Sequence, residues 1–469
     1  MLRRTSPNSS RPDQRSVIPP GAWRPRLTRL RGVAKLLASY AVMALVMMQV
    51  GCSFKEPQST LDPHGFVSRL QIDLFYKTVW VSLFIFVTVG GAMAWAVWRY
   101  RERPGDEGKP MPEQGHGNPL IEIGLITGSI ALLVIIAIPT LKDIFLTDDL
   151  PSDQPYWKTS LLGQWFGKVG EVPEGTDKEP LIITVHGWQW WWSFDYEQFG
   201  FKTANEFTIP AGKVVVFKLR SDNVIHSFWL PKIAGKVDLI PGRANQMWMM
   251  ADDGMAATDG YDHGPVGADT YENGLYYGQC AQYCGESHAF MLFRARVVSE
   301  KDFGQWVADS LKKVPAPAAD GDWGKFLAAV NPDPKLGKAP DASMLATAVE
   351  RGAALFNGRA TCVKCHTIDP TAASTAPNLS RVASRTSLAA GFLDNLDNDG
   401  KSIDPKRQAE NFYNWITHPY DYKPGNYMWY GPLDKGGGLA DIVADNKAKG
   451  TPLTDQDWHD IVAFLMTLK

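Results

Sequence analysis

Two long apolar stretches dominate the first third of the chain. Residues 79–98 carry no charge, and residues 120–141 carry only Glu122. A helix of about 20 apolar residues crosses the ~30 Å hydrocarbon core of a membrane. Arg99, Arg101 and Arg103 follow the first stretch, which places the loop between the two on the cytoplasmic side. The pattern therefore predicts a two-helix hairpin in the lipid bilayer, with spans of about 77–98 and 120–141.

A shorter apolar run, residues 36–50, follows an N-terminal segment rich in Arg and Pro. A positive region, a short apolar region and then a small residue are typical of an export signal. Gly51-Cys52 also suggests a lipoprotein cleavage site with Cys52 lipidated, although Gln49 departs from the aliphatic residue expected there. We interpret residues 1–52 as a signal or lipoprotein-type export segment, and an uncleaved membrane anchor is the alternative.

Beyond the second apolar stretch the pattern changes to short runs rich in β-branched and aromatic residues. Pro210-Ala211-Gly212 and Pro241-Gly242-Arg243 punctuate these runs as turns. Regularly spaced short strands predict a Greek-key sandwich. The expected strands are 181–185, 187–196, 206–209, 213–219, 226–231, 246–250, 275–279 and 289–298.

Helical periodicity returns near the end of the chain. A helix is expected at 299–313, followed by a Pro- and Ala-rich linker, and further helices are expected at 346–356 and 455–468. The predicted organisation is an export segment (1–52), a transmembrane hairpin (53–145), a β domain (146–300), a linker (301–341) and an all-α domain (342–469). Residues 142–180 and 252–270 receive no assigned role.

Composition and cysteine count narrow the function classes. With 48 Lys and Arg against 50 Asp and Glu, the formal net charge is −2, so no nucleic acid partner is implied. The five cysteines each have a separate explanation, because Cys52 belongs to the export segment and the other four fall in two short motifs. None is left over for a structural disulfide.

The first motif runs from Cys280 to Met291 and contains two thiols, an imidazole and a thioether within twelve residues. Soft sulfur ligands together with imidazole suit copper, zinc or iron–sulfur centres. The cysteines are four apart with no second pair nearby, which is not the usual spacing of a structural zinc site. His226 can supply a second imidazole, so that two thiolates could bridge two coppers. A Cys280–Cys284 disulfide is the alternative.

This motif resembles the CuA centre of cytochrome c oxidase subunit II. The resemblance implies the copper ligands His226, Cys280, Cys284, His288, Met291 and the main-chain carbonyl of Gln282. It also implies a cupredoxin-like Greek-key β-barrel for the β domain. In most members of this family a glutamate stands in place of Gln282 and also binds magnesium, so the resemblance does not carry a magnesium site over to this chain.

Two further residues take candidate roles from the same resemblance. Trp190 lies in the aromatic stretch 187–196 and corresponds to the tryptophan that passes electrons from cytochrome c to CuA. Glu122 corresponds to a glutamate at the mouth of a proton channel of subunit I. The alternative for Glu122 is an interfacial helix-start residue favoured by the helix dipole.

The second motif is Cys362-Val363-Lys364-Cys365-His366, the CxxCH pattern of covalent haem c attachment. With the flanking helices and the sequence Lys423-Pro424-Gly425-Asn426-Tyr427-Met428, the last domain resembles a class I cytochrome c. The resemblance implies His366 and Met428 as axial ligands, with Pro377 orienting His366. His418 and Met466 are rival sixth ligands.

Together the two resemblances imply that electrons enter a membrane cytochrome c oxidase through this chain. They would pass from haem c through CuA to subunit I, where oxygen is reduced to water with proton pumping. The expected partners are subunit I, subunit III, and an upstream cytochrome c or quinol-oxidising complex. The expected location is a bacterial inner membrane with both metal domains on the outer side. A CuA-type nitric oxide reductase subunit and a membrane-anchored copper or haem carrier are the alternatives.

Overall fold

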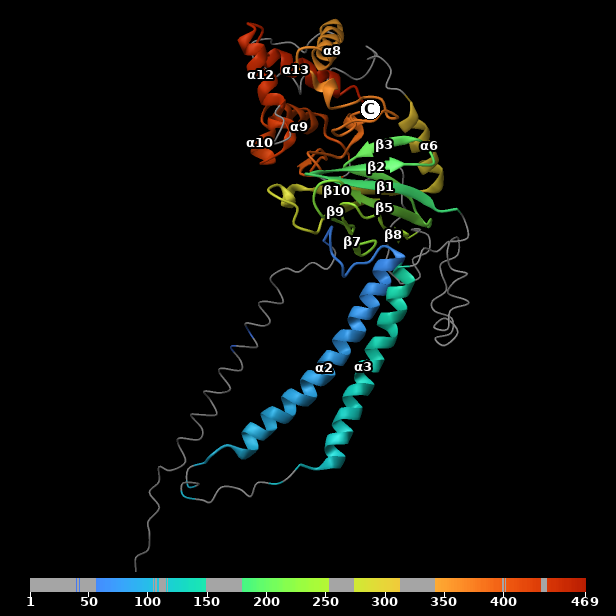
Figure 1. The fold of residues 1–469 in the computed structure, drawn as a ribbon, viewed down its shortest axis with the longest axis vertical. Coiled ribbons are helices and arrows are strands. Elements are labelled where there is room, and N and C mark those ends of the chain that lie inside the picture. Colours follow the sequence, from blue (N-terminus) through green and yellow to red (C-terminus); the bar gives the residue numbers. More distant parts are fainter. Residues whose placement is uncertain are drawn as a thin grey trace, which may run out of the picture. The chain divides into compact units, whose positions relative to one another are not determined.

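The computed structural model describes residues 56–103, 117–148, 179–252, 274–312, 342–398, 402–431 and 437–469, with single positions at 39, 42, 105, 108, 115 and 400 (Figure 1). Residues 57–469 form one compact unit, within which contacts between elements are described below. Cys52, most of the predicted export segment and most of the predicted linker lie outside the described residues. So do residues 149–178 and 253–273, and with them most of the two unassigned stretches.

Two long helices precede the β domain. Helix α2 covers Phe66–Tyr100 and helix α3 covers Pro119–Asp148; they lie close together near the β domain and diverge away from it (Figure 1). Both are long and apolar enough to cross a membrane, and their large apolar side chains are exposed along most of their length. The predicted spans lie inside these helices. Each helix is longer than its predicted span because the helical pattern continues into polar residues at its ends.

The β domain is a sandwich of two five-stranded sheets, in the orders β3-β2-β1-β5-β8 and β4-β10-β9-β6-β7. Pairing is antiparallel except between β1 and β5 and between β4 and β10. The alternating burial along β1 shows why these sequences form strands, since every second side chain enters the core. The strands are β1 Leu181–Trp188, β2 Trp191–Tyr196, β3 Phe201–Ala204, β4 Glu206–Pro210, β5 Val215–Ser221, β6 His226–Trp229, β7 Lys236–Leu239, β8 Asn245–Met249, β9 Leu275–Cys280 and β10 Leu292–Val298.

The aromatic stretch departs from the sequence prediction. It was expected to form one strand over 187–196, but it forms a hairpin in which Trp188 pairs with Trp191. Gln189 and Trp190 therefore lie at the turn, at the end of the sheet rather than within it. Strands β3 and β7 were also not predicted, and buried and exposed positions do not alternate along them.

The segment before α2 ties the membrane hairpin to the sandwich. The His64 amide donates to the Lys232 carbonyl at 2.6 Å, and the Phe66 amide donates to the Met250 carbonyl at 3.0 Å. Asp62 accepts a hydrogen bond from Lys232 Nζ at 2.7 Å. These bonds fix the start of α2 on the edge of the β domain.

The C-terminal part is helical, and its core is formed by α8 packed against α13. Gly352 permits this close packing, because a Cβ there would lie 1.9 Å from the Asp460 carbonyl oxygen. Arg351 forms two hydrogen bonds, at 2.6 and 2.9 Å, with the buried Asp460 carboxylate. The helices are α6 Glu300–Leu311, which follows the sandwich, then α8 Ala342–Asn357, α9 Pro405–Thr417, α10 Pro419–Tyr422, α11 Tyr427–Tyr430, α12 Leu439–Ala448 and α13 Asp455–Leu465; β11 Ser387–Leu388 and β12 Leu393–Asp394 form a small hairpin.

Candidate metal centres

The predicted copper ligands come from two neighbouring strands and the loop between β9 and β10. Cys280 ends β9 and pairs with Phe228 of β6, which brings it beside His226 at the start of that strand. The chain then turns through Cys284 and the short 3-10 helix η2, His288–Phe290, and returns to β10. Gly187 on β1 leaves room for the imidazole, since a Cβ there would lie 2.8 Å from His226 Cδ2.

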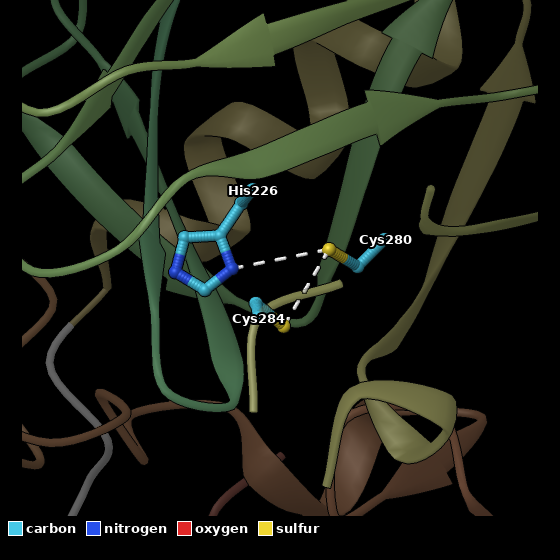
Figure 2. A group of neighbouring side chains, drawn as sticks. All are labelled: His226, Cys280 and Cys284. Atoms are coloured by element: carbon cyan, nitrogen blue, oxygen red, sulfur yellow. Dashed lines mark hydrogen bonds between the residues drawn. The ribbon is translucent and has the colours of Figure 1, made fainter. Parts of the chain in front are cut away.

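The donor atoms converge on one point, as Figure 2 shows for three of them. Cys280 Sγ lies 3.9 Å from His226 Nδ1 and 3.8 Å from Cys284 Sγ. Cys284 Sγ lies 3.5 Å from His288 Nδ1 and 3.8 Å from Met291 Sδ. The main-chain oxygen of Gln282 is 3.2 Å from Cys280 Sγ, while the Gln282 side chain points to solvent. All six predicted ligand groups therefore share one site.

The donor set fits a copper centre. The two sulfurs are not bonded to each other, because 3.8 Å is well beyond the ~2.05 Å of a disulfide. Both thiols, His226 and Met291 are buried. The hydrogen bond between the thiols lowers the pKa of Cys280 and raises that of Cys284, so the pair loses its first proton easily and its second with difficulty. A cation between them would stabilise both thiolates.

Outer contacts orient the imidazole of His226. Its Nε2 lies 3.4 Å from Asn223 Oδ1, so protonation at Nε2 leaves Nδ1 facing the thiols. Asn223 in turn donates to Gln189 Oε1 at 3.2 Å, and Gln189 Nε2 donates to the Cys284 carbonyl at 2.9 Å. The hairpin turn thus contacts both sides of the cluster.

The CxxCH residues lie in the second centre, on and beside the 3-10 helix η3, Cys362–Lys364. His366 Nδ1 lies 2.8 Å from the Pro377 carbonyl, which accepts its N–H and leaves Nε2 unprotonated as an iron ligand requires. Burial lowers the pKa of His366, which favours the neutral ring. This contact lies where the resemblance puts it, and the role of Pro377 in orienting the histidine stays a prediction.

The candidates for the sixth ligand lie in different environments. Met428, on α11, packs against the apolar cluster of the helical domain, together with Cys362. His418 is exposed and contacts Thr417 Oγ1 at 2.8 Å. Met466 is buried in the core beside α13. The environment of Met428 is the one that suits an axial ligand, and its role stays a prediction.

Trp190 is covered rather than open to a partner. It is 7% exposed, and its Nε1 donates to the Cys284 carbonyl at 3.0 Å. Two glycines approach the six-membered ring of the indole, because a Cβ at Gly285 would be 2.9 Å from Cζ2 and a Cβ at Gly425 would be 3.0 Å from Cη2. Gly285 belongs to the cysteine loop and Gly425 to the loop before Met428. The helical domain therefore covers the tryptophan.

The residues that join the two domains were not predicted from the sequence. Tyr427 Oη donates to Gln189 Oε1 at 3.0 Å, Ser287 Oγ donates to the Pro424 carbonyl at 2.6 Å, and Lys423 Nζ donates to the Trp190 carbonyl at 2.5 Å. The two domains also meet along β10, where Arg294 Nη1 donates to the Thr386 carbonyl at 2.8 Å. No local pattern could have found these pairs, because their partners are far away in the sequence.

Glu122 lies in the first turn of α3 and is exposed. Asn118 begins the helix, accepting the Leu120 amide on its Oδ1 at 3.0 Å. This placement agrees both with a channel-mouth role and with an interfacial helix-start residue.

The fold and the two centres define a class of protein, namely a membrane-anchored electron carrier with a cupredoxin-like domain and a cytochrome c domain. The profile "Cytochrome C oxidase subunit II, periplasmic domain" matches residues 200–256, and the profile "Cytochrome c" matches residues 349–469. Cytochrome c oxidase subunit 2 of Alkalihalophilus pseudofirmus is 27% identical over 91% of this chain and 95% of its own length. Quinol oxidase subunit 2 of Bacillus subtilis is 28% identical over 60% of this chain and 74% of its own length.

Among solved structures, the periplasmic domain of cytochrome oxidase subunit II from Bradyrhizobium japonicum is 33% identical, covering 28% of this chain and 94% of that domain, with a TM-score of 0.23. The chain belongs to the cytochrome c oxidase subunit II family and carries a cytochrome c domain at its C-terminus. Electrons enter a haem–copper oxidase complex, which includes subunit I, through this subunit. It is anchored in a membrane and exposes its β domain.

Proposed function

We propose that this chain holds a binuclear CuA centre and a covalently bound haem c, and passes electrons from the haem to the copper and on to subunit I. The observation that carries the proposal is that six donor groups share one site. Each of the other four donor groups lies 3.2–3.9 Å from one of the two cysteine sulfurs, which are themselves 3.8 Å apart. A thiolate-bridged copper pair supplies a one-electron carrier when bound. The reaction proposed for the whole complex is reduction of oxygen to water with proton pumping, which takes place in subunit I.

In this proposal some residues bind the copper and others support the binding residues. The copper would be held by Cys280, Cys284, His226, His288, Met291 and the main-chain carbonyl of Gln282. Asn223 keeps the proton of His226 on Nε2, as its 3.4 Å contact supports. Burial of the cluster excludes water, which limits reorganisation of the site when its charge changes.

The haem would be attached through Cys362 and Cys365, with His366 and Met428 as its axial ligands. The hydrogen bond between His366 and Pro377 supports this assignment because it leaves Nε2 available. Electrons would then reach the copper through the contact that Trp190 makes with the Cys284 carbonyl.

The electron donor would be a cytochrome c or a quinol-oxidising complex acting on the haem domain. Some relatives are named quinol oxidase subunit 2, but the presence of both a thiol cluster and a CxxCH motif supports a donor that delivers single electrons. We place the complex in a bacterial inner membrane with both metal domains on the periplasmic side. A further partner would be subunit III.

Metal analysis of the purified complex tests the proposal. We expect two coppers in this subunit with a delocalised mixed-valence signal in electron paramagnetic resonance, and one haem that stays with the chain in a denaturing gel. A single zinc, or oxidised cysteines without copper, would refute the CuA assignment. Haem that dissociates on denaturation would refute covalent attachment.

A further inference from the structure

The loop from Lys423 to Met428 lies directly on the copper-binding half of the molecule. Gly425 faces Trp190, and the Pro424 carbonyl accepts a hydrogen bond from Ser287, which is next to His288. The same loop carries Met428, the proposed haem ligand. The contact therefore joins the immediate surroundings of the two proposed metals, and not merely two domain surfaces.

Lys423 is the most buried polar side chain of this loop, at 3% exposure. Its Nζ donates to the Trp190 carbonyl at 2.5 Å and to the Ala389 carbonyl at 3.3 Å. Among the described residues no carboxylate pairs with it, so the hydrogen bonds to carbonyls hold it in place. Burial lowers the pKa of Lys423 to about 7, and both the amine and the ammonium form can donate two hydrogen bonds.

Only one of these two hydrogen bonds crosses between the domains. The Ala389 carbonyl belongs to the haem domain, whereas the Trp190 carbonyl belongs to the hairpin turn of the β domain. A buried carbonyl left without a donor is unfavourable, so loss of Lys423 weakens docking of the haem domain. Lys423 thus acts between the domains, and its charge also interacts with the Cys284 thiol.

Tyr427 makes the second bridge. Its hydroxyl donates to Gln189 Oε1 at 3.0 Å, and its ring lies 6.3 Å from the Trp190 ring. Gln189 also donates to the Cys284 carbonyl and accepts from Asn223. Tyr427 precedes Met428 in sequence, so one hydrogen-bonded chain links the haem-ligand loop to both sides of the thiol cluster.

We propose that Lys423 and Tyr427 are positioning residues that hold the haem domain docked on the Gln189–Trp190 turn, so that each electron crosses between the domains inside a closed interface. This inference rests on the proposed function. In the transfer the haem domain loses one electron and the copper domain gains one, and no bond forms or breaks. A mobile donor then delivers its electron to the haem domain and not to Trp190, which the docked loop covers.

The test uses the full-chain oxidase complex with Lys423→Met or Tyr427→Phe. The matched controls are Lys449→Met, which removes an exposed lysine paired with Asp445, and Tyr413→Phe, which removes a hydroxyl bonded to Asp455 within the haem domain. Two quantities are measured: the rate of electron transfer from haem c to copper after photoreduction of the haem, and hydrogen exchange of the main chain over residues 188–192.

We expect Lys423→Met to slow the transfer by about tenfold or more, from the loss of the hydrogen bond to the Trp190 carbonyl across the interface, and Tyr427→Phe to slow it severalfold. Exchange over residues 188–192 should rise in both variants and stay unchanged in both controls. The haem spectrum, the copper resonance signal and the haem reduction potential should remain those of the wild type.

Wild-type transfer rates and wild-type hydrogen exchange in both variants would refute the positioning role of Lys423 and Tyr427. The proposed function would remain intact. Loss of copper or haem from the Lys423 variant would also overturn it, because a residue that only positions the domains leaves both metals bound. If the unsubstituted complex lacked the copper signal, the proposed function would fail. Hydrogen exchange would then still decide whether these two residues hold the domains together.

Discussion

Gly425→Ala tests the closeness of the two domains with a single methyl group. The residue has φ +75°, and the added Cβ would lie 3.0 Å from Trp190 Cη2 and 2.5 Å from Glu286 Oε2. Glu286 is exposed and can change its rotamer, but Trp190 is held by its hydrogen bond to the Cys284 carbonyl and lies close to Gly285. The haem domain must therefore move away from the indole.

This substitution has two effects: backbone strain within the haem domain and a steric clash at the interface between the domains. Placing alanine in the left-handed region costs about 1–2 kcal/mol and weakens the haem domain itself, docked or not. Forcing a methyl group into a packed contact costs about 1–3 kcal/mol, and this cost falls on docking. It corresponds to a roughly 5- to 150-fold change in the docking equilibrium.

Gly450→Ala provides the matched control. Gly450 has φ +73° in the same domain, and a Cβ there would contact nothing within 4 Å. Both variants should lower the thermal midpoint of the haem domain by a similar amount. Only Gly425→Ala should slow electron transfer from haem c to copper, measured after photoreduction of the haem in the full complex. Equal transfer rates in the two variants would refute the close contact between Gly425 and Trp190.

Three further predictions concern the two metal sites and the base of the hairpin. Cys280→Ser should abolish the copper resonance signal while a denaturing gel still shows covalent haem; retained copper would show that the thiol cluster is not the site. Met428→Ala should keep the haem attached but change its spin state and lower its potential, and an unchanged spectrum would transfer the ligand role to another residue. Burial alone would raise the pKa of Asp62, but the hydrogen bond from Lys232 and the charges of His64 and Lys232 lower it overall. The stabilisation from Asp62 should therefore be complete above about pH 4 and be lost as pH falls through the lowered pKa. The thermal midpoints of wild type and Asp62→Asn should converge only in that acidic range. A constant difference between the two midpoints down to pH 2 would contradict the assignment.

Much of the candidate site could be predicted because its chemistry is local in sequence. Cys280, Cys284, His288 and Met291 lie within twelve residues, so one loop places four donors together whatever the rest of the chain does. The same holds for Cys362, Cys365 and His366. The membrane helices were equally clear, since their apolar length alone meets the requirement of a bilayer.

The fold was less fully predictable where short-range pattern and long-range contact compete. The aromatic run at 187–196 has the alternation of one strand, yet it turns at Gln189 and Trp190 because both side chains bond to the Cys284 carbonyl. In strands β3 and β7 buried and exposed positions do not alternate, so these strands depend on their neighbours in the sheet.

By itself the sequence determined which atoms could bind metal, which segments could cross a membrane and which domains the chain contains. These properties depend on residue type and on spacing over a few turns of chain. Only the tertiary structure decided that His226 meets Cys280 across 54 residues, and that Lys423 meets the Trp190 carbonyl across 233. Such contacts arise when sheets pair and domains pack, and no local periodicity records which distant surfaces will meet.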